Sequence, residues 1–332
     1  MKKTALVTTL LAAVCLFAAC SEKEGVYSPK KQISKIYESS TSIYGWLDVE
    51  NNVWSYDTNT SPKALSEEWT WDGGKLSKIV FYETANVNEK SDVSDVVTFS
   101  YDGKQMTRIQ GYDEYMTITY DGNNLKQAQL FDVEDNTLRA TFDFVRDGKK
   151  ITKINVTADM DDMDMKQARV SRIEQTLFRS ILPTVGQADR AAAAVSKAMK
   201  NSGSKANMTV SLNLTWEGDN VSKISMNAMG ASVTGTYTFD NKNNPYQNFL
   251  FGLAGLMDDG AMVVFNENNV VKSVNEMRMS FMGQEFTETD VMNYSYTYDG
   301  NWPLSQTMTN DYGDESEGYS NHSETVTYFE YK

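Results

Sequence analysis

The chain has 332 residues, with 31 Lys and Arg against 45 Asp and Glu, and a formal net charge of −14. A surface with this charge repels phosphate groups, which excludes nucleic acid as a partner. The length is sufficient for a chain to bury a core of its own without help from disulfides.

The N-terminus has the pattern of a secretion signal. Two lysines precede an apolar stretch over residues 5–17, and Ala18-Ala19-Cys20 follows it. A membrane span needs ~20 apolar residues, so the pattern predicts a signal peptide over residues 1–19 instead. Cys15 leaves with this signal and Cys20 follows it directly, so no thiol remains for a disulfide, a thiolate metal site or a nucleophile.

The segment Ala18-Ala19-Cys20 resembles the lipobox of bacterial lipoproteins, although Phe17 stands where that pattern prefers Leu. The resemblance implies that Cys20 becomes the mature N-terminus, with a diacylglycerol on its thiol and a further acyl chain, such as palmitate, on its amine. Two or more acyl chains anchor a protein stably, so the partner implied for Cys20 is a membrane.

Residues 20–32 are predicted to be a lipid-anchored linker. The acidic Ser21-Glu22-Lys23-Glu24 resembles the surface-export signal of Bacteroidetes lipoproteins, and an ordinary solvated linker is the alternative. The resemblance implies an outer-membrane location, at the cell surface rather than the periplasmic face.

A short repeat runs through the rest of the chain. It consists of an aromatic residue, an acid, Gly or Asn, two variable residues, and then an apolar residue. Gly and Asn adopt positive φ readily, so each copy predicts a hairpin tip between alternating strands. The copies are Trp71-Asp72-Gly73, Tyr101-Asp102-Gly103, Tyr120-Asp121-Gly122, Arg146-Asp147-Gly148, Trp216-Glu217-Gly218 and Tyr298-Asp299-Gly300, with the weaker Phe239-Asp240-Asn241 and Phe265-Asn266-Glu267.

Eight tips predict about sixteen strands, with further strands within Ile36–Asp57 and Thr325–Tyr331. Short local connections favour an up-and-down meander. The predicted fold is mainly β: one antiparallel domain over residues 33–332 that forms a barrel or a strongly curved sheet.

A longer interval separates Gly148 from Gly218. Ile173, Leu177 and Ile181 recur every four residues within it, which is typical of a helix. We therefore expect a two-helix insertion at about residues 160–201.

The lipobox and the recurring Tyr-Asp-Gly tips together are similar to a family of Bacteroidetes lipoproteins of unknown function that has a porin-like β fold. The segment Phe239–Tyr246 also resembles that family. Lys78, Arg108, Lys153 and Lys223 lie inside predicted strands, which disfavours a lipid-facing wall. We expect these cations on one solvated face of the sheet, paired across strands with acids.

The sequence provides little for catalysis. The only histidine, His322, lies in a polar segment, and no phosphate-binding glycine loop or nucleophile elbow is present. The acidic run at residues 159–164 lacks the Gly and terminal Glu of an EF-hand loop. We therefore assign no catalytic, cofactor-binding or metal-binding residue and expect no cofactor.

Aromatic residues are the remaining candidates for a site. Trp69, Trp71, Trp216 and Trp302 lie in or beside predicted strands and turns, where they can stack on a ligand or fill the core.

Three functions stay open, and the missing catalytic motifs favour binding over enzymatic activity. The first is a lipid-anchored cell-envelope protein that binds a glycan or an envelope protein partner. The second is a carrier for an apolar, lipid-like ligand in a half-barrel cavity plugged by the helical insertion. The third is a glycan hydrolase that uses two carboxylates, although no pair stands out among 45 acids.

Overall fold

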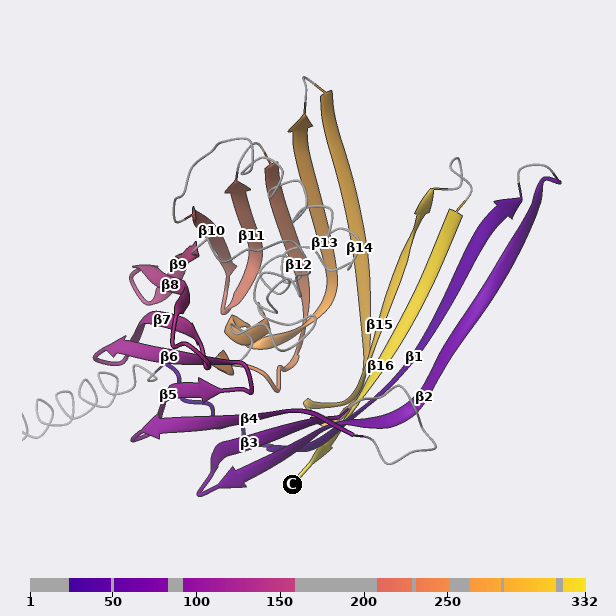
Figure 1. Cartoon of the computed structure of the whole chain (residues 1–332). Helices are drawn as coiled ribbons and strands as arrows, with labels where there is room; N and C mark the ends of the chain where they lie inside the picture. Colours follow the sequence, from indigo (N-terminus) through magenta and orange to yellow (C-terminus); the bar gives the residue numbers. More distant parts are fainter. Residues whose placement is uncertain are drawn as a thin grey trace, which may run out of the picture.

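The computed structural model describes residues 24–48, 51–82, 92–158, 208–228, 231–250, 263–281, 284–314 and 319–332. These residues form a closed barrel of sixteen antiparallel strands, shown in Figure 1. Each strand pairs with its neighbours in the chain, and β1 pairs with β16 to close the barrel. The predicted antiparallel meander and the barrel are confirmed.

The strands differ in length. Those on one side of the barrel, β1, β2 and β12–β16, have 13 to 20 residues, whereas β3–β11 have 6 to 10. Their bounds are β1 Ile33–Asp48, β2 Val53–Asp72, β3 Lys75–Tyr82, β4 Val93–Asp102, β5 Gln105–Gln110, β6 Glu114–Asp121, β7 Asn124–Asp132, β8 Leu138–Asp147, β9 Lys150–Ala158, β10 Met208–Glu217, β11 Asn220–Ala228, β12 Ala231–Asn243, β13 Asn268–Phe281, β14 Gln284–Asp299, β15 Trp302–Asp314 and β16 Tyr319–Tyr331.

The expected two-helix insertion is corrected. In the described ranges the structure is a β-barrel without an α-helix, and a 3-10 turn, η2 (Val263–Phe265), precedes β13. The proposed insertion at about 160–201 lies outside the described residues. Apolar spacing of four is a multiple of the strand period of two as well as close to a helical turn, so the spacing could not establish a helix.

The Asp-Gly steps lie at hairpin tips on one end of the barrel, here called the turn end. Six glycines there have φ between 55° and 63°, as the reversals require: Gly73, Gly103, Gly122, Gly148, Gly218 and Gly300. The two weaker copies do not form tips of their own. Phe239-Asp240-Asn241 lies near the end of β12, and Phe265-Asn266-Glu267 ends the longer connection, residues 244–267, between β12 and β13.

The repeat has a second structural purpose, because its aromatic side chain reaches back to an earlier hairpin. The Tyr101 hydroxyl donates to the Leu76 carbonyl over 2.8 Å, and the Trp216 indole donates to the Ile151 carbonyl over 2.6 Å. Trp71 and Tyr120 do the same with Ile33 and Met106. Three of these rings thereby fix one hairpin to the preceding one at the turn end, and Trp71 fixes its hairpin to the start of β1.

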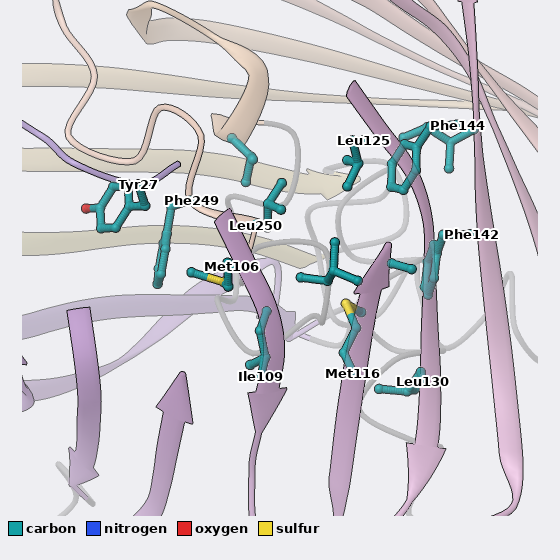
Figure 2. Packing of buried hydrophobic residues seen from close by; sticks show 14 of the residues in the cluster. Tyr27, Met106, Ile109, Met116, Leu125, Leu130, Phe142, Phe144, Phe249 and Leu250 are labelled. Carbon is teal, nitrogen blue, oxygen red and sulfur yellow. The ribbon is translucent and has the colours of Figure 1, made fainter. Parts of the chain in front are cut away.

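The inner face of β3–β12, here called the apolar wall, forms the main core. Alternate residues point inward and are buried, as in Ile79, Val97 and Met116. Figure 2 shows Phe249 and Leu250, from the β12–β13 connection, packed inside the barrel against this wall.

The outer wall is polar. Ser211, Asn213 and Thr215 face outward on β10, while Val210, Leu212 and Leu214 between them are buried. Lys78, Arg108, Lys153 and Lys223 also lie on the outer wall. The cross-strand neighbours of these cations are not the expected acids. They are Thr70 and Thr98 for Lys78, Ser100 and Thr117 for Arg108, Val145 and Asn213 for Lys153, and Thr215 and Thr236 for Lys223.

Candidate functional site

An aromatic cluster closes the barrel at its turn end. The ring of Tyr27 lies 4.7 Å from that of Phe249, and the Phe249 ring lies 5.1 Å from Trp69 and 5.9 Å from Phe99. Tyr27 also donates its hydroxyl to the Pro245 carbonyl over 2.8 Å. These side chains, all less than a tenth exposed, fill this part of the lumen with packed rings.

Residues 24–32, here called the N-terminal strap, lie across the same end. The Glu24 amide donates to the Asn123 carbonyl over 2.9 Å, and the Glu24 carboxylate accepts from the Leu125 amide over 2.6 Å and pairs with Arg146. Arg146 stands where the other repeats have an aromatic residue. Its departure from the repeat is explained by this ion pair.

Gly25 is required for the strap to approach so closely. Its φ is +71°, and a Cβ at this position would overlap the Tyr120 ring. The Gly25 carbonyl accepts from the Met106 amide over 2.9 Å. The strap thus supplies acceptors for amides of two hairpins.

The inner face of β13–β16, β1 and β2 differs from the apolar wall and is here called the polar wall. One row of six directly paired residues crosses the polar wall. Four of these residues carry an amide or hydroxyl group and are buried or partly buried. The row is Ser273, Met292, Asn310, Ser323, Ser42 and Asn59. The next row includes Asn275 beside Asp290, both at most 4% exposed. The inner positions described on these strands hold no Lys or Arg.

Three amide groups on the polar wall have unused acceptors. The Oδ1 atoms of Asn275, Asn310 and Asn321 are buried and accept no hydrogen bond within the described part of the chain. A buried acceptor without a donor costs roughly 1–3 kcal/mol. Groups of this kind in a native protein call for an explanation, and a bound donor is one.

A buried acid, Glu67, lies on the inner face where β1 and β2 enter the aromatic cluster. It is paired across strands with Ile36, and it accepts a 2.6 Å hydrogen bond from the Trp69 indole. Burial raises the pKa of Glu67 to about 8, against the lowering effect of that hydrogen bond. Glu38 lies two residues from Ile36 on the same face, and its charge also raises the Glu67 pKa.

Two pairs of aromatic residues lie on opposite faces of the β1–β2 hairpin, near its tip. Tyr44 and Trp46 are on the inner face, 49% and 43% exposed, with ring centroids 6.2 Å apart. Trp54 and Tyr56 stack at 6.2 Å on the outer face. The alternation of β1 from the buried Ile36 fixes these directions.

The four tryptophans singled out from the sequence lie at the turn end. Trp69 and Trp71 come together, with centroids 6.4 Å apart, and Trp69 is 3% exposed. Trp216 and Trp302 lie on separate hairpins, and Trp302 packs edge-on against Tyr331. Their stacking on a ligand stays a prediction.

The remaining sequence candidates have simple placements. Cys20 and the acidic run at residues 159–164 lie outside the described residues. His322 pairs with Asp311 across β15 and β16 on the outer wall, with Nδ1 2.5 Å from Oδ1. No group of three or more His, Cys, Asp or Glu within the described ranges is placed to hold a metal ion. No helix among the described residues is long and apolar enough to cross a membrane.

Sequence patterns alone do not single out the polar wall or the strap. The only available signal for the wall was that the inward positions of β13–β16 include Ser, Asn and Asp among Met and aromatic residues, where those of β3–β12 are mostly Ile, Val, Leu, Met and Phe. That signal needs the pairing register, because alternation alone does not say which set faces inward.

Comparison with known proteins gives structural neighbours only. No protein-family model matches the sequence, and no curated protein matches it. A porin-like protein from Bacteroides uniformis aligns at 11% identity and a TM-score of 0.48, covering 93% of this chain and all of that one. One from Bacteroides vulgatus aligns at 10% identity and 0.44, covering 91% and 99%. The description of the barrel therefore rests on its own strand pairing.

Proposed function

We propose that this protein is a lipid-anchored barrel of the cell envelope that binds a glycan along its polar wall. The observation that carries the binding role is the set of three buried amide oxygens on that wall that accept no hydrogen bond within the described chain. Sugar hydroxyls are donors that would satisfy them, provided that binding uncovers these oxygens, which are shielded from solvent in the unbound barrel.

The outer wall supports a tethered barrel rather than one embedded in lipid. A membrane-spanning barrel needs an apolar band about 25 Å tall on its outward positions. The outward positions of β9–β12 are polar. They hold Lys, Asn and Thr on β9, Thr, Ser and Asn on β10, Lys, Ser and Asn on β11, and Ser and Thr on β12. Such a wall favours contact with water, and membrane attachment then falls to Cys20.

The shape and charge of the polar wall favour a neutral glycan. Tyr44 and Trp46 provide half-exposed rings beyond the amide row, on the same face. Sugar-binding sites combine such rings with a few fixed polar groups. Asp290 and Glu38 on this face, without an inward cation in the described positions, disfavour acidic polysaccharides.

The experiment is affinity electrophoresis of the mature protein in gels that contain xylan, mannan, dextran or an acidic polysaccharide. We expect saturable retention on a neutral polymer. Replacing Tyr44 and Trp46 together with Ala should weaken retention at least tenfold. The matched control replaces Trp54 and Tyr56, which lie on the outer face of the same hairpin, and should leave retention unchanged.

No retention on any polymer would overturn the glycan proposal. Equal loss in both double variants would mean that the hairpin, rather than its inner face, is needed for binding. Retention on the acidic polymer alone would contradict the charge argument and would favour an outer-surface site with the lysines.

A second candidate function is hydrolysis of the bound glycan, favoured by Glu67. Its raised pKa, about 8, keeps it protonated at neutral pH, as a general acid requires. Glu38, on the same inner face, would be the second carboxylate of the pair.

Release of reducing ends from the retained polysaccharide tests this candidate. Glu67→Gln preserves the acceptor for the Trp69 indole and should abolish release while retention persists. The absence of release by the unaltered protein on every retained polymer removes the hydrolase and leaves the binding proposal intact.

A further inference from the structure

We infer that the turn end of the barrel faces a phospholipid surface, and that the polar wall and the β1–β2 hairpin tip point away from it. The inference rests on the proposed anchor at Cys20 and adds the orientation that this anchor imposes. Two independent features carry it: the fixed course of the N-terminal strap and the distribution of charge between the two ends.

The strap is held to several hairpins of the turn end. Besides the contacts of Glu24 and Gly25 with β6–β8 and β5, the Lys31 ammonium lies 2.5 Å from the Asp299 carboxylate at the β14–β15 tip. Tyr27, between them, is 2% exposed. The chain therefore enters the barrel across the turn end along a defined path, rather than through a free linker.

The distance from the anchor is short. Cys20 precedes Glu24 by four residues, which span at most about 14 Å. The opposite end, here called the far end, is much further away, since the 16 residues of β1 extend about 50 Å. An acyl chain on Cys20 can thus reach a bilayer only beside the turn end.

Charge is distributed to suit this orientation. At the turn end, the tip acids Asp72, Asp102 and Asp147 are accompanied by lysines, and the other tip acids are Asp121, Glu217, Asp219 and Asp299. A further cation lies on the outer wall of alternate strands just beyond the tips. The tip and strap lysines are Lys30, Lys31, Lys75, Lys104, Lys149 and Lys150, and the outer-wall cations are Lys78, Arg108, Lys153, Lys223 and Lys272.

The far end carries mainly acids in its described turns. Asp113 lies in the β5–β6 turn, and Glu134 and Asp135 lie in the β7–β8 turn, all exposed. Anionic headgroups attract Lys and Arg by about 1 kcal/mol each and repel acids. A chain with a net charge of −14 is least repelled by a bilayer when its far end is the distant one.

The test places one spin label at either end of the lipidated protein. Lys104→Cys labels the turn end and Asn51→Cys the far end, and Cys15 and Cys20 are the only native cysteines. The protein is inserted into vesicles of phosphatidylethanolamine and phosphatidylglycerol that contain a nickel-chelating lipid. We expect nickel to increase the relaxation rate of the label at position 104 severalfold and to leave that at position 51 unchanged.

Two variants separate the strap from the anchor. Glu24→Ala removes the strap's ion pair with Arg146 and should reduce the nickel effect at position 104. Glu217→Ala removes an exposed turn-end acid and should leave the effect in place.

The outcomes distinguish this inference from the proposal on which it rests. A mass spectrum without acyl chains on Cys20, and a protein that does not bind vesicles, would refute the anchor itself. An acylated, vesicle-bound protein with a larger effect at position 51, or with equal effects at both positions, would refute the orientation alone.

Discussion

The two halves of the barrel share one outer surface and differ inside. On the apolar wall, the inward positions of neighbouring strands are Ile79, Val97 and Ile109, all at most 2% exposed. On the polar wall, the corresponding positions include Ser273, Asn275 and Asn310, also at most 4% exposed. Burial therefore has opposite consequences in the two sets. It stabilises the first set, and it leaves amide oxygens of the second set without a donor among the described residues.

This contrast indicates that the repeat specifies the barrel, while the inward residues specify what each half does. The tips and their reaching aromatic rings occur on both sides, as Tyr101 bonds to Leu76 and Trp71, at the end of β2, bonds to Ile33. A half that only needed to be stable would carry apolar residues throughout. If the polar half gives up stability for binding, substitutions on the apolar wall should have the largest effects on stability and those on the polar wall the smallest.

The largest effect is expected on the apolar wall. Ile79→Ala should lower the free energy of unfolding by about 2–5 kcal/mol, because it removes buried contacts and leaves a cavity. Ile79 is completely buried between Trp69 and Val97. Chemical denaturation measures the change, and Thr98→Ala, on the outer face of the adjoining rung, is the control with an expected change under about 0.5 kcal/mol.

The sequence predicted this half well. Alternation and turn chemistry are local properties, so they gave the strands, the Asp-Gly tips at Gly103 and Gly122, and the antiparallel order. The closure between β1 and β16 could not be derived in the same way, because it joins Ile36 to Phe329 across nearly the whole chain. The described ranges hold no α-helix, and the spacing that suggested a helical insertion is a local one that was interpreted without its tertiary context.

A smaller effect, on the order of a few kcal/mol, is expected from Glu67 at the boundary between the halves. Its folded-state pKa of about 8 lies above the ordinary value of 4.5. Its stabilising contribution is therefore complete below about pH 4.5, and it is lost as the pH rises to about 8, where the folded protein also releases the proton. Glu67→Gln should make the free energy of unfolding flatter over that interval.

Denaturation of both proteins at several pH values between those limits measures the difference. Glu68→Gln, the next residue on the outward face, should retain the slope of the unaltered protein. A slope for Glu67→Gln that equals that of the unaltered protein would show that Glu67 does not titrate in this range.

A change of about 0.5–1.5 kcal/mol is expected for the repeat itself. Tyr101→Phe removes the hydroxyl that donates to the Leu76 carbonyl and should destabilise by that amount, as does the loss of a typical hydrogen bond. Tyr112→Phe is the control, since Tyr112 is 82% exposed. Thermal unfolding followed by circular dichroism measures the change. Equal unfolding midpoints for the two variants would contradict the proposed role of the Tyr101 hydroxyl.

The candidate site was less accessible to sequence reasoning than the fold. Trp69 and Trp216 attracted attention because tryptophan is conspicuous, yet they lie in the turn-end packing. Asn310 is an ordinary residue in a sequence, and its significance comes from facing inward, from burial, and from an oxygen without a donor in the described chain. Those three properties depend on register and closure, which are set by the whole barrel.

The smallest effect on stability, and the most direct test of the contrast, is expected for Asn310→Leu. The change replaces a buried amide, whose oxygen has no donor within the described ranges, by an apolar side chain of similar size beside Met292 on β14. The free energy of unfolding should stay within about 1 kcal/mol of the original value or increase, because no satisfied hydrogen bond of that oxygen is lost. Retention on the neutral polysaccharide should nevertheless fall at least tenfold. If this variant were destabilised as strongly as Ile79→Ala, Asn310 would belong to the packing of the barrel, and the two halves would not differ in purpose.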